Sequence, residues 1–84
     1  MKYVRLSAAA AREVAADADV SPSDAAVLDG LDQYSRDPAI TAMAMGASGV
    51  EAVDALTRGV DMARYSEQVG YGRPHEEAIS RSQY

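Results

Sequence analysis

The chain has 84 residues, a net charge of −5 and no cysteine, so it has room for one domain and excludes disulfides, thiolate nucleophiles and cysteine-based zinc sites. Alanine supplies 17 residues, whereas phenylalanine and tryptophan are absent, which favours helices packed closely around a thin core. The acidic excess lies in residues 13–61. It argues against direct binding to nucleic acid or to an anionic membrane, because both require positive potential.

The first segment, residues 2–6, alternates weakly in polarity and is read either as a short strand or as the start of a first helix. That helix covers about residues 7–19 and consists mostly of alanine. No apolar run in the chain is long enough for a signal peptide or a membrane span. We therefore expect a cytoplasmic protein, or one within a virion or another intracellular assembly, that is not secreted.

Two further helix starts are marked by proline. Ser21-Pro22-Ser23-Asp24 combines an N-cap, a proline at the first helical position and an acid at the third, and it predicts a helix over about 22–35. Asp37-Pro38 repeats the cap and the proline and predicts a helix over about 38–46.

The longest predicted helix follows the capping box Ser48-Gly49-Val50-Glu51 and covers about residues 49–69. It carries two apolar stripes, and a helix with two such stripes usually contacts two different surfaces. Gly70 to Pro74 ends it. We find no internal repeat, and we expect an all-α fold of about four short helices, with a helical domain over 1–69 and an extended C-terminal arm over 70–84.

The candidate groups for chemistry are few. His75, the single histidine, is followed by Glu76 and Glu77, which suggests a metal ligand or a general base. Three consecutive residues point in three directions around a helix, however, so we expect His75 to be solvated. Without a nucleophile motif or a phosphate-binding glycine loop, the sequence predicts no enzyme, no cofactor and no metal.

The C-terminal part is rich in Tyr, Arg and Met, the residue types that are enriched at protein interfaces. We expect a non-catalytic interaction or structural subunit of a larger assembly, such as a phage particle, bound to a larger protein or to copies of itself. The expected partner-binding residues lie on the last predicted helix and on the arm: Met62, Tyr65, Val69, Tyr71, Arg73, Ile79, Arg81 and Tyr84.

Two alternatives remain open. A row of exposed carboxylates can imitate a phosphate backbone and inhibit a nucleic-acid-binding protein, and six aspartates are spaced for this role: Asp17, Asp19, Asp24, Asp29, Asp32 and Asp37. Residues 2–36 present a basic strand, a helix, Ser21-Pro22-Ser23 and a second helix ending at Tyr34. This order resembles ribbon-helix-helix repressors and antitoxins, although the first helix is about one turn shorter than is usual there. The resemblance implies DNA contact through Lys2 and Arg5.

Overall fold

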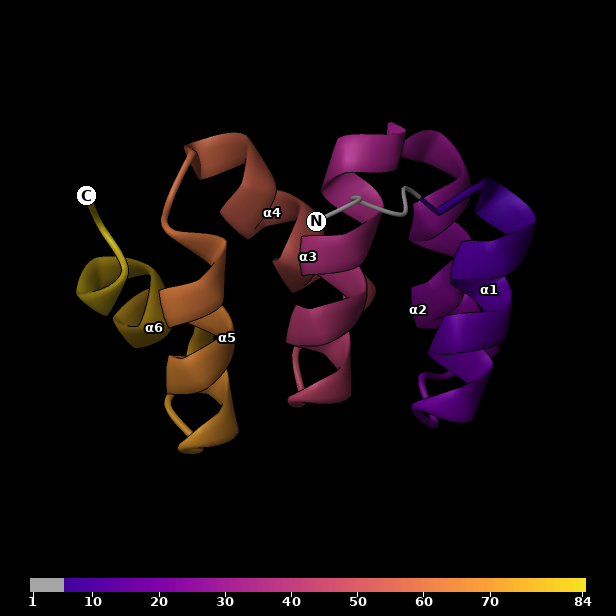
Figure 1. The fold of residues 1–84 in the computed structure, drawn as a ribbon. Helices are drawn as coiled ribbons and strands as arrows, with labels where there is room; N and C mark the ends of the chain where they lie inside the picture. Colours follow the sequence, from indigo (N-terminus) through magenta and orange to yellow (C-terminus); the bar gives the residue numbers. More distant parts are fainter. Residues whose placement is uncertain (1–5) are drawn as a thin grey trace, which may run out of the picture.

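Three helical hairpins follow one another along the chain, and their first helices lie side by side (Figure 1). The computed structural model describes residues 6–84, which contain six α-helices, one 3₁₀ turn and no strand. The segment 2–6, interpreted either as a short strand or as the start of the first helix, falls almost entirely outside these residues. The elements are α1 (Ala8–Asp17), α2 (Pro22–Ala25), the 3₁₀ turn η1 (Ala26–Gly30), α3 (Gln33–Ala44), α4 (Gly49–Arg58), α5 (Met62–Gly70) and α6 (His75–Arg81).

The hairpins repeat at intervals of 27 and 26 residues. Their first helices end at Asp17, Ala44 and Gly70. After a loop of four residues, their second helices begin at Pro22, Gly49 and His75. Within the stack, α3 packs between α1 and α5, while α4 packs against α2 and η1 of the preceding hairpin. Stacking of similar helical hairpins, each in contact with its neighbours, is the building principle of helical-repeat proteins.

The loops of the three hairpins have the same backbone geometry. Their second residues all adopt positive φ, at Asp19 (60°), Gly46 (125°) and Gly72 (85°). Their third residues donate backbone hydrogen bonds to equivalent carbonyls: Val20 to Ala15 (2.9 Å), Ala47 to Ala42 (3.0 Å) and Arg73 to Gln68 (3.2 Å). This is the Schellman arrangement, which satisfies the last carbonyls of a helix and reverses the chain.

These loops continue into a short sequence repeat that the sequence analysis missed. The segments 19–25, 46–52 and 72–78 each contain a left-handed residue, an N-cap residue, an acid at the third helical position and then alanine. The alanines are Ala25, Ala52 and Ala78, and all three are buried. The expectation of no internal repeat was wrong, because the repeat is confined to a few capping positions and small residues that pattern inspection passes over.

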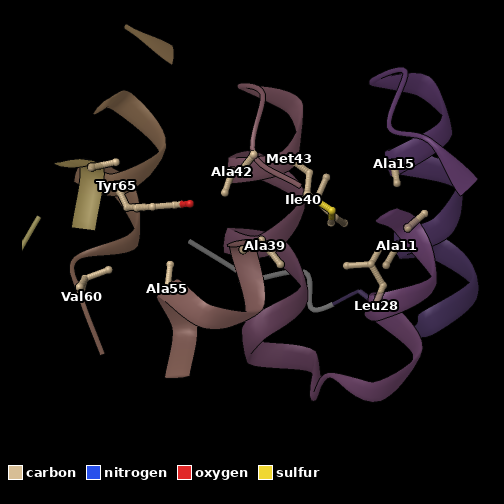
Figure 2. Close-up of a cluster of buried hydrophobic side chains, with 14 of the residues drawn as sticks. Ala11, Ala15, Leu28, Ala39, Ile40, Ala42, Met43, Ala55, Val60 and Tyr65 are labelled. Atoms are coloured by element: carbon tan, nitrogen blue, oxygen red, sulfur yellow. The ribbon is translucent and has the colours of Figure 1, made fainter. Parts of the chain in front are cut away.

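The core of the stack is built mainly from alanine. Of the fifteen buried apolar side chains in residues 6–84, nine are alanines. Figure 2 shows the buried side chains spread along the stack, from Ala11 and Ala15 on α1 to Val60 and Tyr65 at the far end. Small side chains let helix backbones approach closely, so the core is extended and thin.

The second predicted helix, 22–35, is divided in the structure. It ends as η1 at Gly30, and α3 begins after Asp32, whose carboxylate accepts hydrogen bonds from the backbone N–H groups of Tyr34 (2.9 Å) and Ser35 (3.0 Å). The predicted start at Asp37-Pro38 was therefore wrong, and Pro38 lies inside α3. A stronger cap upstream outweighs the one backbone hydrogen bond that a proline removes.

The long predicted helix 49–69 is also divided. Gly59 ends α4 in the left-handed conformation (φ 72°), and Asp61 caps α5 by accepting a hydrogen bond from the backbone N–H of Arg64. The two apolar stripes expected on one helix thus belong to two helices, α4 and α5. Because α4 and α5 are separate helices, α5 packs against α3, whereas α4 also packs against α2 and η1 of the first hairpin.

The predicted extended arm, 70–84, contains a loop and α6. Helix α6 packs against α5 and buries Ala78 and Ile79 in the core. Ser82 is fully buried, and its carbonyl accepts a hydrogen bond from the backbone N–H of Asp61 at 2.9 Å. Helix α6 is therefore the second helix of the third hairpin, and the extended segment expected there is replaced by packed structure.

Candidate functional site

The only histidine lies in the largest cluster of polar contacts in the described residues, at the junction of α4, α5 and α6. His75 Nδ1 is 2.8 Å from the hydroxyl of Tyr65, and His75 Nε2 is 2.7 Å from Asp54 Oδ2. The rings of Tyr65 and His75 meet edge to face. Arg58 and Glu76 extend the group, which we call the His75 cluster (Asp54, Arg58, Tyr65, His75 and Glu76).

The cluster occupies a repeat position that is apolar in the preceding interface. Between the first two hairpins, Val27 packs against Gly49. Asp54 and His75 occupy the corresponding positions between the second and third hairpins, 27 and 26 residues further on. Tyr65 likewise corresponds to Ala39, and both are fully buried. A polar contact has thus replaced an apolar one at the same point in the stack.

The charged groups of the cluster pair with one another. The hydrogen bond from His75 lowers the pKa of the Asp54 carboxyl, and the charge of Arg58 acts in the same direction against the desolvation of the carboxyl. Arg58 pairs with both oxygens of Glu76 (2.9 and 3.1 Å) and with Asp54 (3.2 Å). The hydrogen bond to Glu76 is the main reason that the pKa of Arg58 is raised.

The buried phenol stays protonated to high pH. Burial raises the pKa of Tyr65 to about 12, and the negative charges of Glu51 and Asp54 add to the effect. A protonated Tyr65 can donate to Nδ1 of a neutral His75, whose Nε2–H then donates to Asp54. In this arrangement both ring nitrogens are used by the chain itself, and neither is available to a substrate.

One oxygen or nitrogen atom from each of Asp54, His75 and Glu76 lies within 4.8 Å of the other two, a spacing that suits a metal ion. Arg58, however, already contacts both carboxylates. A divalent cation would have to displace this guanidinium and the hydrogen bond from His75 to Asp54. The residues present therefore fit a structural junction better than a metal centre.

The expectation that His75 is solvated was wrong. Its side chain is only 16% exposed. Pro74 is the N-cap of α6 and lies at the end of the Schellman loop. This loop brings the first residue of α6 against α4 and α5, so that the imidazole enters the interface instead of extending into solvent.

The structure separates the expected partner-binding residues into three groups. Tyr65 and Ile79 lie in the core of the chain itself, and Met62 and Val69 are partly buried against that core. Arg73 and Arg81 both pair with Glu77. The other two, Tyr71 and Tyr84, are 67% and 95% exposed.

Sequence reasoning did not single out Met45. This residue is the C-cap of α3, and Tyr71 is the C-cap of α5, so the two are equivalent in the repeat. Met45 is 48% exposed and lies against Gly70, the residue before Tyr71. The signal that could have identified it is the 26-residue spacing to Tyr71.

Comparison with known proteins assigns no relatives: no family model matches the chain, and neither a curated protein nor a solved structure is significantly similar to it. No helix in residues 6–84 is both long enough and apolar enough to cross a membrane. The functional argument therefore depends on the geometry of the chain itself.

Proposed function

We propose that this protein is a non-catalytic binding subunit that packs against another protein. The observation that carries the proposal is the exposure of Met45 and Tyr71, which come from equivalent positions of neighbouring hairpins, with Met45 lying against Gly70, the residue before Tyr71. Large apolar side chains exposed at matching positions of a helical array form a continuous surface, and such surfaces are the usual binding sites of repeat proteins.

The surface lies at the loop edge of the stack. In Figure 1 the loops that follow α1, α3 and α5 all lie at the lower edge. The C-cap residues at this edge are Ala18, Met45 and Tyr71 in turn, so the exposed apolar side chains lie at the second and third hairpins. We define the loop-edge patch as Met45, Gly70 and Tyr71. Tyr and Met are among the residue types that form interface centres.

The context we propose is a larger assembly, such as a phage particle, with a larger protein or further copies of the chain as the partner. The cytoplasm or the interior of such an assembly is the proposed location. The thin alanine core supports this proposal, because a small domain with little buried apolar area gains stability when a partner binds its folded form.

The two alternatives have less support. Three of the six aspartates needed for nucleic-acid mimicry have roles within the fold: Asp24 binds the N–H of Gly49, Asp29 pairs with Arg12 and Asp32 caps α3. The ribbon-helix-helix alternative requires a continuous helix up to Tyr34, whereas the chain leaves helical structure after Gly30 and begins α3 anew at Gln33.

Site-specific cross-linking tests the proposal. A photoreactive phenylalanine analogue at Tyr71 should form a defined adduct in the native source, whereas the same analogue at exposed Thr57 on α4 should not. The adduct partner, purified separately, should bind the wild type and lose at least about tenfold in affinity with Tyr71→Ala. An unaffected affinity, or a chain that forms adducts equally at both positions and stays monomeric by light scattering, would reject the function.

A further inference from the structure

A small pocket opens between α3 and α5, away from the His75 cluster. Its volume is about 160 Å³. Three residues of α3 and three of α5 line it: Asp37, Pro38, Thr41, Met62, Ala63 and Ser66. Cofactor and drug-sized sites usually measure about 300–1,000 Å³, so this pocket has room for a single side chain and not for a cofactor.

One of the residues that line the pocket, Ser66, carries a buried hydroxyl without a partner. Ser66 is only 3% exposed, yet its Oγ makes no hydrogen bond within residues 6–84. A buried polar atom without a partner is costly, and native proteins seldom retain one without a reason. Because this Oγ is closed to solvent, a group in the pocket hydrogen-bonds to it only after the Ser66 side chain turns toward the pocket, and such a bond would remove this cost.

The other polar groups of the pocket are acceptors. Thr41 uses its hydroxyl proton on the carbonyl of Asp37, at 3.0 Å, and so offers only oxygen lone pairs. The Asp37 carboxylate forms no ion pair with any residue in 6–84. Its neighbour Arg36 is engaged elsewhere, because its guanidinium donates to the carbonyls of Leu6 (2.9 Å) and Leu28 (3.3 Å).

The remaining walls are apolar and come from Pro38, Met62 and Ala63. They suit a chain of methylene groups, and the acceptors suit a cation with several N–H donors at its end. We propose that this pocket receives a lysine side chain of the protein partner, with the ammonium paired to Asp37 and hydrogen-bonded to Ser66 Oγ. This inference rests on the proposed function, since it supplies a recognition site for the same class of partner.

Nuclear magnetic resonance titration with Nα-acetyl-lysine methylamide tests the pocket. At millimolar concentrations this compound should saturably shift the backbone amides of residues 37, 39–41 and 62–66. The norleucine analogue, which has the methylene groups without the charge, should not. Asp37→Asn should weaken binding about threefold to fivefold, the upper part of the range for an exposed ion pair. The control Asp17→Asn makes the same change of charge on α1 and should leave the affinity unchanged.

Ser66→Ala supplies the second arm. It removes a buried hydroxyl that has no partner, so the variant should fold at least as stably as the wild type and still bind the lysine compound more weakly. Equal shifts with the norleucine compound, shifts outside the pocket, or a titration insensitive to both substitutions would overturn the inference. The loop-edge patch is tested at Tyr71 with the partner itself, so failure of the pocket leaves the binding function standing.

Discussion

Asp24 accepts a hydrogen bond at 2.8 Å from the backbone N–H of Gly49, and this bond joins the second helices of the first two hairpins. The close approach depends on the glycine, because a Cβ at position 49 would lie 2.8 Å from the Asp24 carbonyl oxygen and 3.0 Å from Val27 Cγ1. Asp24 stands at the third position of α2, where an acid can complete a capping box with its own N-cap. Its carboxylate instead binds the first residue of α4, in the next hairpin.

Gly49→Ala should therefore destabilise the protein, although alanine has the better helix propensity. The overlap is with backbone atoms, so α2 and α4 must separate, and we expect a loss of about 1–3 kcal/mol in urea unfolding followed by circular dichroism. Gly30→Ala is the matched control. A Cβ at position 30 meets nothing within 4 Å, and this variant should be neutral or slightly stabilised.

The C-terminal segment gives a second prediction. Ile79 is buried on α6, so Ile79→Ala should cost about 2–5 kcal/mol in the free energy of unfolding. Tyr84→Ala, at a side chain that is 95% exposed, should change it by less than about 0.5 kcal/mol. If both variants unfold like the wild type, α6 contributes nothing to the core.

Tyr65→Phe isolates the hydroxyl in the His75 cluster. It leaves Nδ1 of a mostly buried imidazole without its hydrogen-bond partner, so we expect a loss of about 1–3 kcal/mol by the same measurement. Tyr71→Phe removes an exposed hydroxyl that bonds only to Glu67 and should be nearly neutral. An equal effect of the two substitutions would contradict the assigned role of the buried hydroxyl.

The same phenol predicts alkaline behaviour. Because the pKa of Tyr65 is raised from 10.0 to about 12, its contribution to stability is complete below pH 10 and is lost as the pH rises through 12. Ultraviolet titration of the wild type should show a tyrosine that ionises late, near pH 12. This late step should disappear in Tyr65→Phe and persist in Tyr71→Phe.

Acid acts on the cluster through Asp54. Since the folded state lowers the pKa of this carboxyl below 3.8, its contribution to stability is present above that value and is lost as the pH falls further through the lowered pKa. Asp29, paired with Arg12, acts with the same sign. Asp54→Asn should therefore flatten part of the acid decline in melting temperature. A profile that Asp54→Asn leaves unaltered would contradict this coupling.

The all-helical architecture and three of the helix starts follow from the sequence, because capping is a local interaction. Ser7, Ser21 and Ser48 all act as N-caps, and Ser48 forms the expected capping box with Glu51. The helix ends were harder to predict. Gly59 resembles an interior residue between two apolar stripes, and only its left-handed conformation shows that the chain turns there.

The environment of His75 could not be predicted, since it depends on stacking over long sequence distances. Asp54 and Tyr65 are 21 and 10 residues away in sequence, and neither pattern nor propensity places them beside the imidazole. The 26- and 27-residue spacing would have helped, because it aligns His75 with Gly49 and Asp54 with Val27. Recognising that spacing required the positive-φ residues Gly46 and Gly72, whose conformation is set by the fold.

The contrast between Val27 with Gly49 and Asp54 with His75 makes the three units non-interchangeable. A histidine at position 49 would overlap with the backbone of Asp24. A glycine at position 75 would remove the hydrogen bonds that Asp54 and Tyr65 make to the imidazole. The interface between the first two hairpins therefore fits glycine and excludes histidine, whereas the interface between the second and third hairpins requires the histidine. The succession of the units is thereby encoded in side-chain chemistry as well as in the covalent connection of the polypeptide.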